Sequence, residues 1–110
     1  MIFIHKTAEV HKTAKVGESS EIWNNAQIRE YAILGKGCIV STGVYIDHHV
    51  VMGDNCRIQN YASIYYQTTI EANVFIGPHA CIINDKSPRA ALPSGLPKQS
   101  ADWQPGHTHI

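Results

Sequence analysis

Large aliphatic residues recur at every sixth position over the first three quarters of the chain, without a change of phase. The series runs Ile4, Val10, Val16, Ile22, Ile28, Leu34, Val40, Ile46, Met52, Ile58, Ile64, Ile70, Ile76, Ile82. Small or β-branched residues stand four positions after these anchors, from Ala8 to Ala80. A period of six fits neither an amphipathic helix nor an alternating strand. The pattern therefore predicts two inward-facing positions in each six-residue unit.

Such a period is typical of a parallel β-helix built from hexapeptides. A β-sandwich would need turns at irregular intervals, and these would break the phase. Three hexapeptides make one triangular coil, so residues eighteen apart stack and their strands pair in parallel. Fourteen units at three per coil predict about four and two-thirds coils. The predicted fold class is all-β, a left-handed parallel β-helix, with the left hand taken from the resemblance described below.

The repeat ends after Ile83. Four of the five prolines lie beyond it, among polar residues, which is typical of a loop. We therefore expect a β-helix over residues 1–83 and an extended loop or tail over residues 84–110. This tail is in a position to cap the last coil, whose edge would otherwise promote association.

Several residue types fit the predicted coil closely. Residues that tolerate positive φ stand three positions after anchors, where corners are expected: Asn25, Gly37, Gly43, Asn55, Asn73 and Asp85.

Cys38 and Cys56 are eighteen apart in the inward phase and should stack as buried thiols, whereas Cys81 should face outward. Three cysteines without metal-type spacing favour a reducing cytoplasm.

The net charge and the N-terminal sequence limit which kinds of binding partner we expect. The net charge is zero and the pI is about 7.0, which disfavours nucleic acid or an anionic membrane as the main partner. The N-terminal residues enter the repeat at once, and no apolar run approaches the length of a membrane span. We expect a cytoplasmic protein that neither inserts into membranes nor binds nucleic acid.

The stacking also aligns outward side chains into columns. One corner gathers titratable and hydrogen-bonding residues: Asp47, His48, His49, Tyr65, Tyr66, Gln67, Asn84 and Asp85. Another corner carries Asn60 beside Tyr61 and His79. Because a narrow prism has no internal pocket, a ligand site must lie between two prisms or under the projecting tail. A solvated corner, or a subunit contact without chemistry, is the alternative.

Several runs together resemble a known family: Glu21-Ile22-Trp23, Gly37-Cys38, Arg57-Ile58-Gln59-Asn60, Ser63-Ile64-Tyr65, Ile70-Glu71, Val74-Phe75-Ile76-Gly77-Pro78, Asn84-Asp85 and Pro88-Arg89-Ala90. They are similar to nucleotide-sugar N-acetyltransferases, which acetylate a 3-amino group on a UDP-linked amino sugar in lipopolysaccharide or O-antigen synthesis. These enzymes belong to the hexapeptide-repeat acyltransferase superfamily, whose members work as homotrimers. The resemblance covers residues 5 to 90.

This resemblance implies a chemistry. An asparagine at the position of Asn84 holds the acceptor amine, which attacks the thioester of acetyl-CoA, and the leaving sulfur takes the proton. Other hexapeptide enzymes use a histidine as general base, so His49 is the alternative base here. Besides the first corner, Asn60 and Arg89 are expected to contact substrate. Acetyl-CoA is the expected co-substrate, its binding residues stay unassigned, and no metal is expected.

The sequence departs from the family in ways that keep alternatives open. Gln67 stands where the family commonly has Gly, and Thr42 where it has Gln. Residues 100–108 resemble the stretch that leads into further coils, so a shortened relative is expected and its activity stays open. The main alternative is a non-catalytic trimeric scaffold or ligand-binding module. A γ-type carbonic anhydrase is disfavoured because it needs a His-x4-His pair, whereas His48 and His49 are neighbours.

Overall fold

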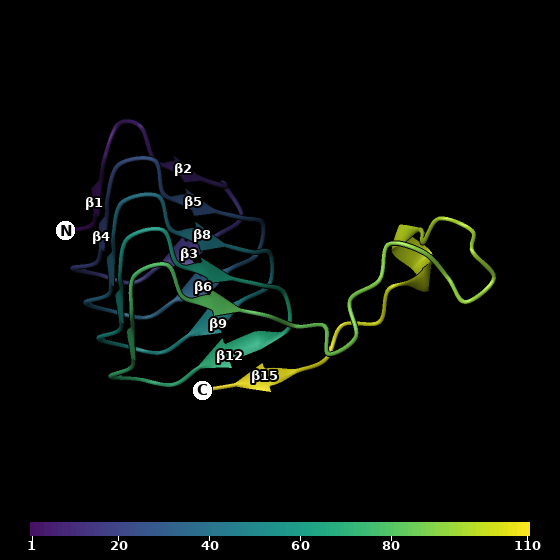
Figure 1. The fold of residues 1–110 in the computed structure, drawn as a ribbon. Coiled ribbons are helices and arrows are strands. Elements are labelled where there is room, and N and C mark those ends of the chain that lie inside the picture. The colour runs from purple at the N-terminus through teal and green to yellow at the C-terminus, as the bar shows by residue number, and fades with distance from the viewer.

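The computed structural model describes residues 1–110 as three parallel sheets wound into a triangular prism, from which an arm projects (Figure 1). The first sheet contains β1 (Phe3–Ile4), β4 (Glu21–Ile22), β7 (Ile39–Val40), β10 (Arg57–Ile58) and β13 (Phe75–Ile76). The second contains β2 (Glu9–Val10), β5 (Gln27–Ile28), β8 (Tyr45–Ile46), β11 (Ser63–Ile64) and β14 (Cys81–Ile82). The third contains β3 (Lys15–Val16), β6 (Ile33–Leu34), β9 (Val51–Met52), β12 (Thr68–Ile70) and β15 (Thr108–His109).

The strand register follows the predicted eighteen-residue repeat. Ile4 pairs with Ile22, which pairs with Val40, and the same offset holds throughout the first fourteen strands. Every pairing between named strands is parallel, as expected when successive coils stack. The prediction of an all-β parallel β-helix of hexapeptides is confirmed, and the arrangement is consistent with the left-handed form.

The predicted inward positions form the core of the prism. Anchors of the middle coils such as Ile28, Ile46 and Ile64 are at most 1% exposed, whereas Ile4 in the first coil is 46% exposed. Cys38 and Cys56 are buried free thiols and Cys81 is exposed, as predicted. The core is therefore thin and most complete at mid-length.

Corner residues adopt the left-handed conformation at every sixth position from 19 to 79: Ser19, Asn25, Tyr31, Gly37, Gly43, His49, Asn55, Tyr61, Gln67, Asn73 and His79. The prediction is confirmed for the glycines and asparagines and is wrong for Asp85, because the chain has left the coil by that point. Bulky residues such as Tyr31 and His49 were not expected there, since a side chain makes this conformation costly.

The tail leaves the prism after Ile83 and returns as β15. Thr108 pairs with Thr68, forty positions earlier rather than eighteen, so residues 84–107 form an arm inserted into the repeat. An antiparallel bridge joins Ala91 to Pro97, and the 3-10 helix η1 spans Ser100–Asp102. In Figure 1 the arm extends away from the prism, while β15 adds a fifth strand to the third sheet. No helix in the structure is long and apolar enough to cross a membrane.

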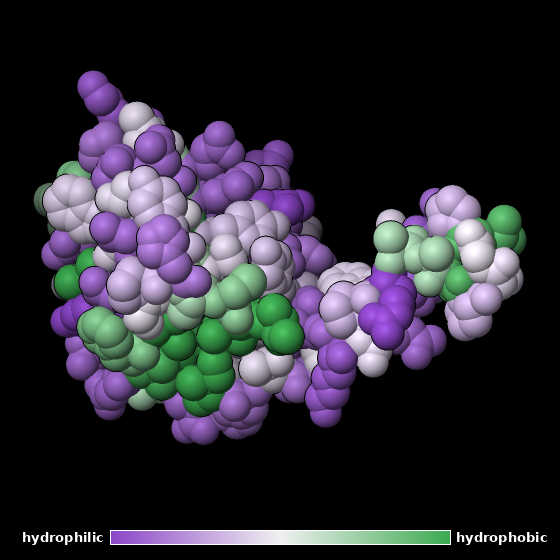
Figure 2. Space-filling model, in the orientation of Figure 1, coloured by the Kyte–Doolittle hydropathy of each residue, from purple (hydrophilic) through white to green (hydrophobic).

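The end of the last coil is apolar. Ile82 is only partly buried, Ile83 is 63% exposed and Ile110 is 37% exposed. Figure 2 shows apolar residues gathered at the lower end of the prism, near the C-terminal strand, under a mostly hydrophilic surface. In Figure 1 the arm projects away from the prism, and β15 lies beside β12 at this end.

Candidate functional site

The carboxylate of Asp47 organises the corner that the sequence singles out. It is 8% exposed, and its Oδ1 accepts hydrogen bonds from the Tyr45 hydroxyl at 3.0 Å and the His48 N–H at 2.8 Å. Its Oδ2 accepts from the N–H of Tyr66, in the next coil, at 2.9 Å. Both oxygens are therefore engaged, and Asp47 joins two coils at the base of the corner.

Two histidines and two tyrosines form stacked ring pairs around Asp47 at this corner. The His48 ring lies 4.3 Å from Tyr66 with an interplanar angle of 16°, and the His49 ring lies 5.2 Å from Tyr31. Nδ1 of His48 lies 2.9 Å from Nδ1 of His49. One nitrogen of this contact must donate and the other accept, so the two rings orient each other.

The side chain of Asn84 is fixed in one orientation. Its Nδ2 donates to the main-chain oxygen of Tyr66 at 3.0 Å, and its own main-chain oxygen accepts from Gly106 at 2.6 Å. The Oδ1 atom makes no hydrogen bond within the chain. It is a half-buried acceptor at the point where the arm leaves the prism.

A groove of about 390 Å³ surrounds Asn84. Its walls are Tyr65, Ile83, Asn84, Asp85, Pro88 and Trp103. The indole of Trp103 donates to Oδ2 of Asp85 at 3.2 Å, which closes the groove from the arm. We call this the acceptor groove. It combines a largely apolar wall with one amide acceptor and one carboxylate, the usual composition of a small-molecule site.

The structure brings most of the expected site residues together. Tyr65, Asn84 and Asp85 line the acceptor groove, with Tyr66 directly beneath Asn84, and the two histidines continue the same corner outside the groove. Arg89 lies further along the arm, in a neighbouring groove. Gln67 is close by, but its Oε1 contacts Nδ1 of His107 at 3.2 Å rather than the groove.

Asn60 is not part of this group. It is exposed at a different corner, where the ring of Tyr61 stacks on His79 at 5.4 Å and lies against Gly43. Within one chain it cannot contact the acceptor groove. Sequence reasoning also missed Trp103, because only the folded arm places that residue next to Asp85.

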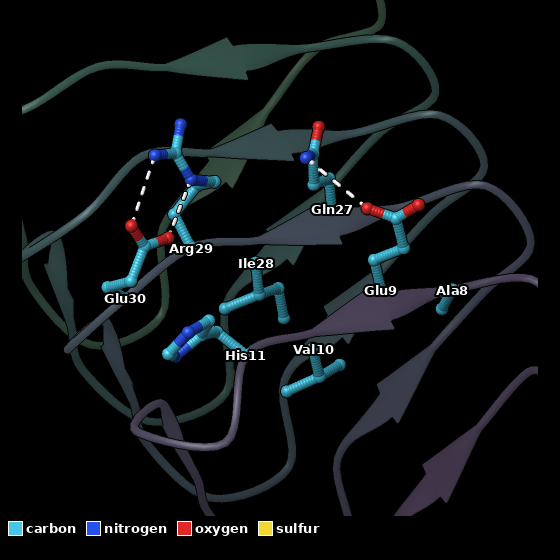
Figure 3. A pocket seen from close by; sticks show the side chains of 8 residues that line it. All are labelled: Ala8, Glu9, Val10, His11, Gln27, Ile28, Arg29 and Glu30. Atoms are coloured by element: carbon cyan, nitrogen blue, oxygen red, sulfur yellow. Dashed lines mark hydrogen bonds and ion pairs between the residues drawn. The ribbon is translucent and has the colours of Figure 1, made fainter.

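A separate groove of about 420 Å³ lies on the first two coils (Figure 3). Two of its charged side chains form an ion pair, since Arg29 contacts both oxygens of Glu30 at 2.7 and 3.2 Å. This contact lowers the pKa of Glu30 to about 2. None of the expected site residues lines this groove, so it is not our candidate site.

Arg29, from this ion pair, is also linked by hydrogen bonds to Asp47 at the corner described above. Nη1 of Arg29 donates to the Tyr45 hydroxyl at 2.9 Å, and that hydroxyl donates to Asp47. Burial and the bond to Asp47 raise the pKa of Tyr45, so it stays a protonated donor. Nowhere in the structure do three His, Cys, Asp or Glu side chains lie close enough together to hold a metal ion.

Two family models match the repeat. Residues 49–84 match the bacterial transferase hexapeptide (six repeats), and residues 32–48 match the hexapeptide repeat of succinyl-transferase. These matches agree with the eighteen-residue register, and the structure shows the parallel β-helix of hexapeptides that the repeat predicts. No curated protein sequence matches the chain.

Solved structures share this fold. The acetyltransferase domain of PglB from Neisseria gonorrhoeae FA1090 matches with a TM-score of 0.61 and 24% identity, over 76% of this chain and 49% of that one. The same domain in complex with acetyl coenzyme A matches with a TM-score of 0.59 and 22% identity, over 74% and 50%. At these identities the likeness shows the fold alone. The chain spans about half the length of these structures.

Proposed function

We propose that this chain is part of an N-acetyltransferase that moves an acetyl group from acetyl-CoA to the amine of a nucleotide-linked amino sugar. The observation that carries the proposal is the position of Asn84, which lines the acceptor groove, with its Nδ2 held by Tyr66 and its Oδ1 without a hydrogen-bond partner in the chain. A fixed carbonyl acceptor beside an apolar wall suits an amine on a sugar ring. The acetyltransferase structures that share the fold are consistent with this chemistry.

In the proposed reaction, Asn84 Oδ1 accepts a hydrogen bond from one N–H of the neutral acceptor amine. The nitrogen lone pair then attacks the thioester carbonyl carbon, a C–N bond forms, and the C–S bond breaks. The proton lost by nitrogen goes to the departing sulfur, which leaves coenzyme A as a thiol. Asn84 contributes position rather than proton transfer, because a carboxamide is not a base at neutral pH.

The histidine pair offers a different destination for the proton. His48 and His49 contact each other at 2.9 Å and can accept a proton through a free ring nitrogen. Neither lines the acceptor groove, whereas Asn84 does. We therefore propose Asn84 as the residue that orients the amine and keep His49 as the alternative base.

The chain is expected to assemble as a homotrimer with threefold symmetry. Its outward face carries large exposed aromatic residues, among them Tyr31 at 56%, Tyr61 at 53% and Phe75 at 66%. Burying them between prisms would also allow the Asn60 corner of one subunit to approach the acceptor groove of another. Sedimentation at micromolar concentration tests this, since a stable monomer would exclude a site shared between subunits.

Acetyl transfer is tested with purified protein, acetyl-CoA and a UDP-linked 3-amino sugar, with release of the coenzyme A thiol as the readout. The matched control is the same sugar nucleotide with a hydroxyl in place of the amine. Thiol release only with the amine supports the proposal. If acetyl-CoA neither binds nor reacts, the scaffold alternative is correct.

A further inference from the structure

We propose that a repeated His-Lys-Thr-Ala unit closes the N-terminal edge of the prism to the C-terminal edge of a second copy of this chain. The unit occupies residues 5–8 and, six positions later, residues 11–14. Each unit forms a turn at one of the first two corners of the prism. The inference depends on the geometry of the first coil and is independent of the proposed acetyl transfer.

The two ends of the prism otherwise match. Figure 1 shows β1 and β2 at one end and β15 at the other. The three aliphatic ladders begin in strands that pair on one side only, at Ile4, Val10 and Val16. They finish at the opposite edge, at Ile76, Ile82 and Ile110. A second copy placed head to tail would therefore continue all three sheets, and an unprotected edge of this kind promotes association.

The corners of the later coils join each coil to the one before it. At most corners from Gly37 onward, a residue with positive φ donates its N–H to a main-chain oxygen of the preceding coil. The N–H of His79, for example, donates to the oxygen of Asn60 at 2.9 Å. In a second copy added at the C-terminal edge, Thr7 takes the place that follows His79 in this column. It would have to donate in the same way, to the oxygen of Pro78.

Thr7 and Thr13 cannot make such a bond, because their N–H groups are already used within the first coil. Neither residue has positive φ, as expected for a β-branched side chain, for which that conformation is costly. The N–H of Thr7 donates to Nδ1 of His5 at 3.1 Å, and the N–H of Thr13 donates to Nδ1 of His11 at 3.2 Å. The two corner donors that a second copy would need are therefore occupied.

The threonine hydroxyls attach these turns to the second coil. Oγ1 of Thr7 lies 3.0 Å from Nδ1 of His5 and accepts from the N–H of Asn25 at 3.0 Å. The second unit repeats these two contacts, at 2.8 and 2.9 Å, with Thr13, His11 and Tyr31. Since each Nδ1 accepts from a threonine N–H, the proton of the neutral ring must be on Nε2. The unit therefore requires the Nε2–H tautomer of both histidines.

The lysines of the two units add a second obstacle to association. Lys6 and Lys12 are exposed at the tips of the same turns, and neither forms an ion pair. A coil added at this edge would have to cover both charges. Lysine on an exposed sheet edge is a common means of preventing edge-to-edge association. The N-terminal edge is therefore closed by its charges as well as by its occupied donors.

The test is sedimentation of the full chain over a wide range of protein concentration. An opened variant combines four substitutions: His5→Ala, Thr7→Asn, His11→Ala and Thr13→Asn. It removes the imidazole acceptors and supplies asparagine, the residue with positive φ at the Asn25 corner. We expect the mass of the wild type to stay constant with concentration. The mass of the opened variant should keep rising, because head-to-tail contacts do not close.

Two further variants identify the surfaces involved. A control with Thr42→Asn and His107→Ala makes the same exchanges away from the N-terminal edge and should behave as wild type. Ile110→Lys, added to the opened variant, should stop the rise in mass, because it places a charge at the opposite edge. A folded opened variant with the constant mass of wild type would overturn the inference. So would a rise in mass that persists with Ile110→Lys, or a rise in the wild type itself.

Nitrogen NMR of the wild-type chain tests the same contacts without any substitution. At neutral pH both His5 and His11 should show the Nε2–H tautomer, and the amide protons of Thr7 and Thr13 should exchange slowly with solvent. A proton on Nδ1 of either ring would overturn the inference, because that nitrogen could no longer accept. Neither measurement depends on catalysis, so a failure of acetyl transfer would leave the inference intact.

Discussion

The amide nitrogen of Asn84 donates to the main-chain oxygen of Tyr66 at 3.0 Å, one coil below it. The bond fixes the orientation of the amide, because a flipped amide would set two oxygens against each other, and it leaves Oδ1 without a partner in the chain. Asn84 therefore presents a hydrogen-bond acceptor at the junction of prism and arm. That orientation suits an amine and would oppose a second carbonyl or carboxylate.

The stability of the fold should depend on the aliphatic side chains that stack inside the prism at intervals of eighteen residues. Ile58 is fully buried between Val40 and Ile76 in the first sheet, so Ile58→Ala should lower the free energy of unfolding by about 2–5 kcal/mol. Ile58→Asp should prevent folding, because a lone charge in so thin a core finds no partner. Urea denaturation measures both, with the exposed Val51→Ala as control. A cooperative, near-normal transition for Ile58→Asp would contradict the core assignment.

The three cysteines should differ in reactivity. Cys38 donates its thiol to the Gly53 oxygen at 3.2 Å, and burial raises its pKa, so little reactive thiolate forms. Cys56 is buried in the same column, whereas Cys81 is exposed. A thiol reagent should therefore label one cysteine rapidly in the native chain and all three in denaturant. Rapid native labelling that persists in Cys81→Ser would show that the coils open readily.

The corner should depend on the carboxylate of Asp47. In Asp47→Asn, an NH2 group must face either the His48 N–H or the Tyr66 N–H, and one half-buried donor loses its acceptor. We expect a loss of about 1–3 kcal/mol in the free energy of unfolding. Asp54→Asn is the matched control, because its single bond to the Lys36 N–H can be kept by the amide oxygen. Equal stability of the two variants would argue against the role assigned to Asp47.

The sequence was sufficient to predict the prism because a six-residue period determines the coil and the offset between stacked residues. It placed Asn84 above Tyr66 and Tyr66 above His48, and both contacts are present, at 3.0 Å and 4.3 Å. It also placed Asp85 above Gln67, which is wrong because the chain leaves the coil at that point. His107 contacts Gln67 instead, at 3.2 Å.

The arm could not be predicted in the same way. The resemblance of residues 100–108 to a stretch that leads into further coils pointed to a return of the chain, but no periodicity relates Thr108 to Thr68, so the register of their pairing could not be predicted. The contact between Trp103 and Asp85 also depends on how the arm turns back on itself. The sequence therefore predicted only one side of the acceptor groove. The residues on the prism followed from the repeat, whereas Trp103 on the arm did not.

The most direct measurement is kcat/KM for acetyl transfer to a UDP-linked 3-amino sugar by the wild-type chain, Asn84→Ala, His48→Ala and His49→Ala. Loss of one hydrogen bond worth about 0.5–1.5 kcal/mol predicts a decrease of about two- to twelvefold for Asn84→Ala, and more if the amine is also misplaced. The histidine variants should lose less than Asn84→Ala, and the melting temperature of Asn84→Ala should stay near that of wild type. A loss of about 10²–10⁴-fold at either histidine, the usual effect of removing a general base, would contradict the role given to Asn84.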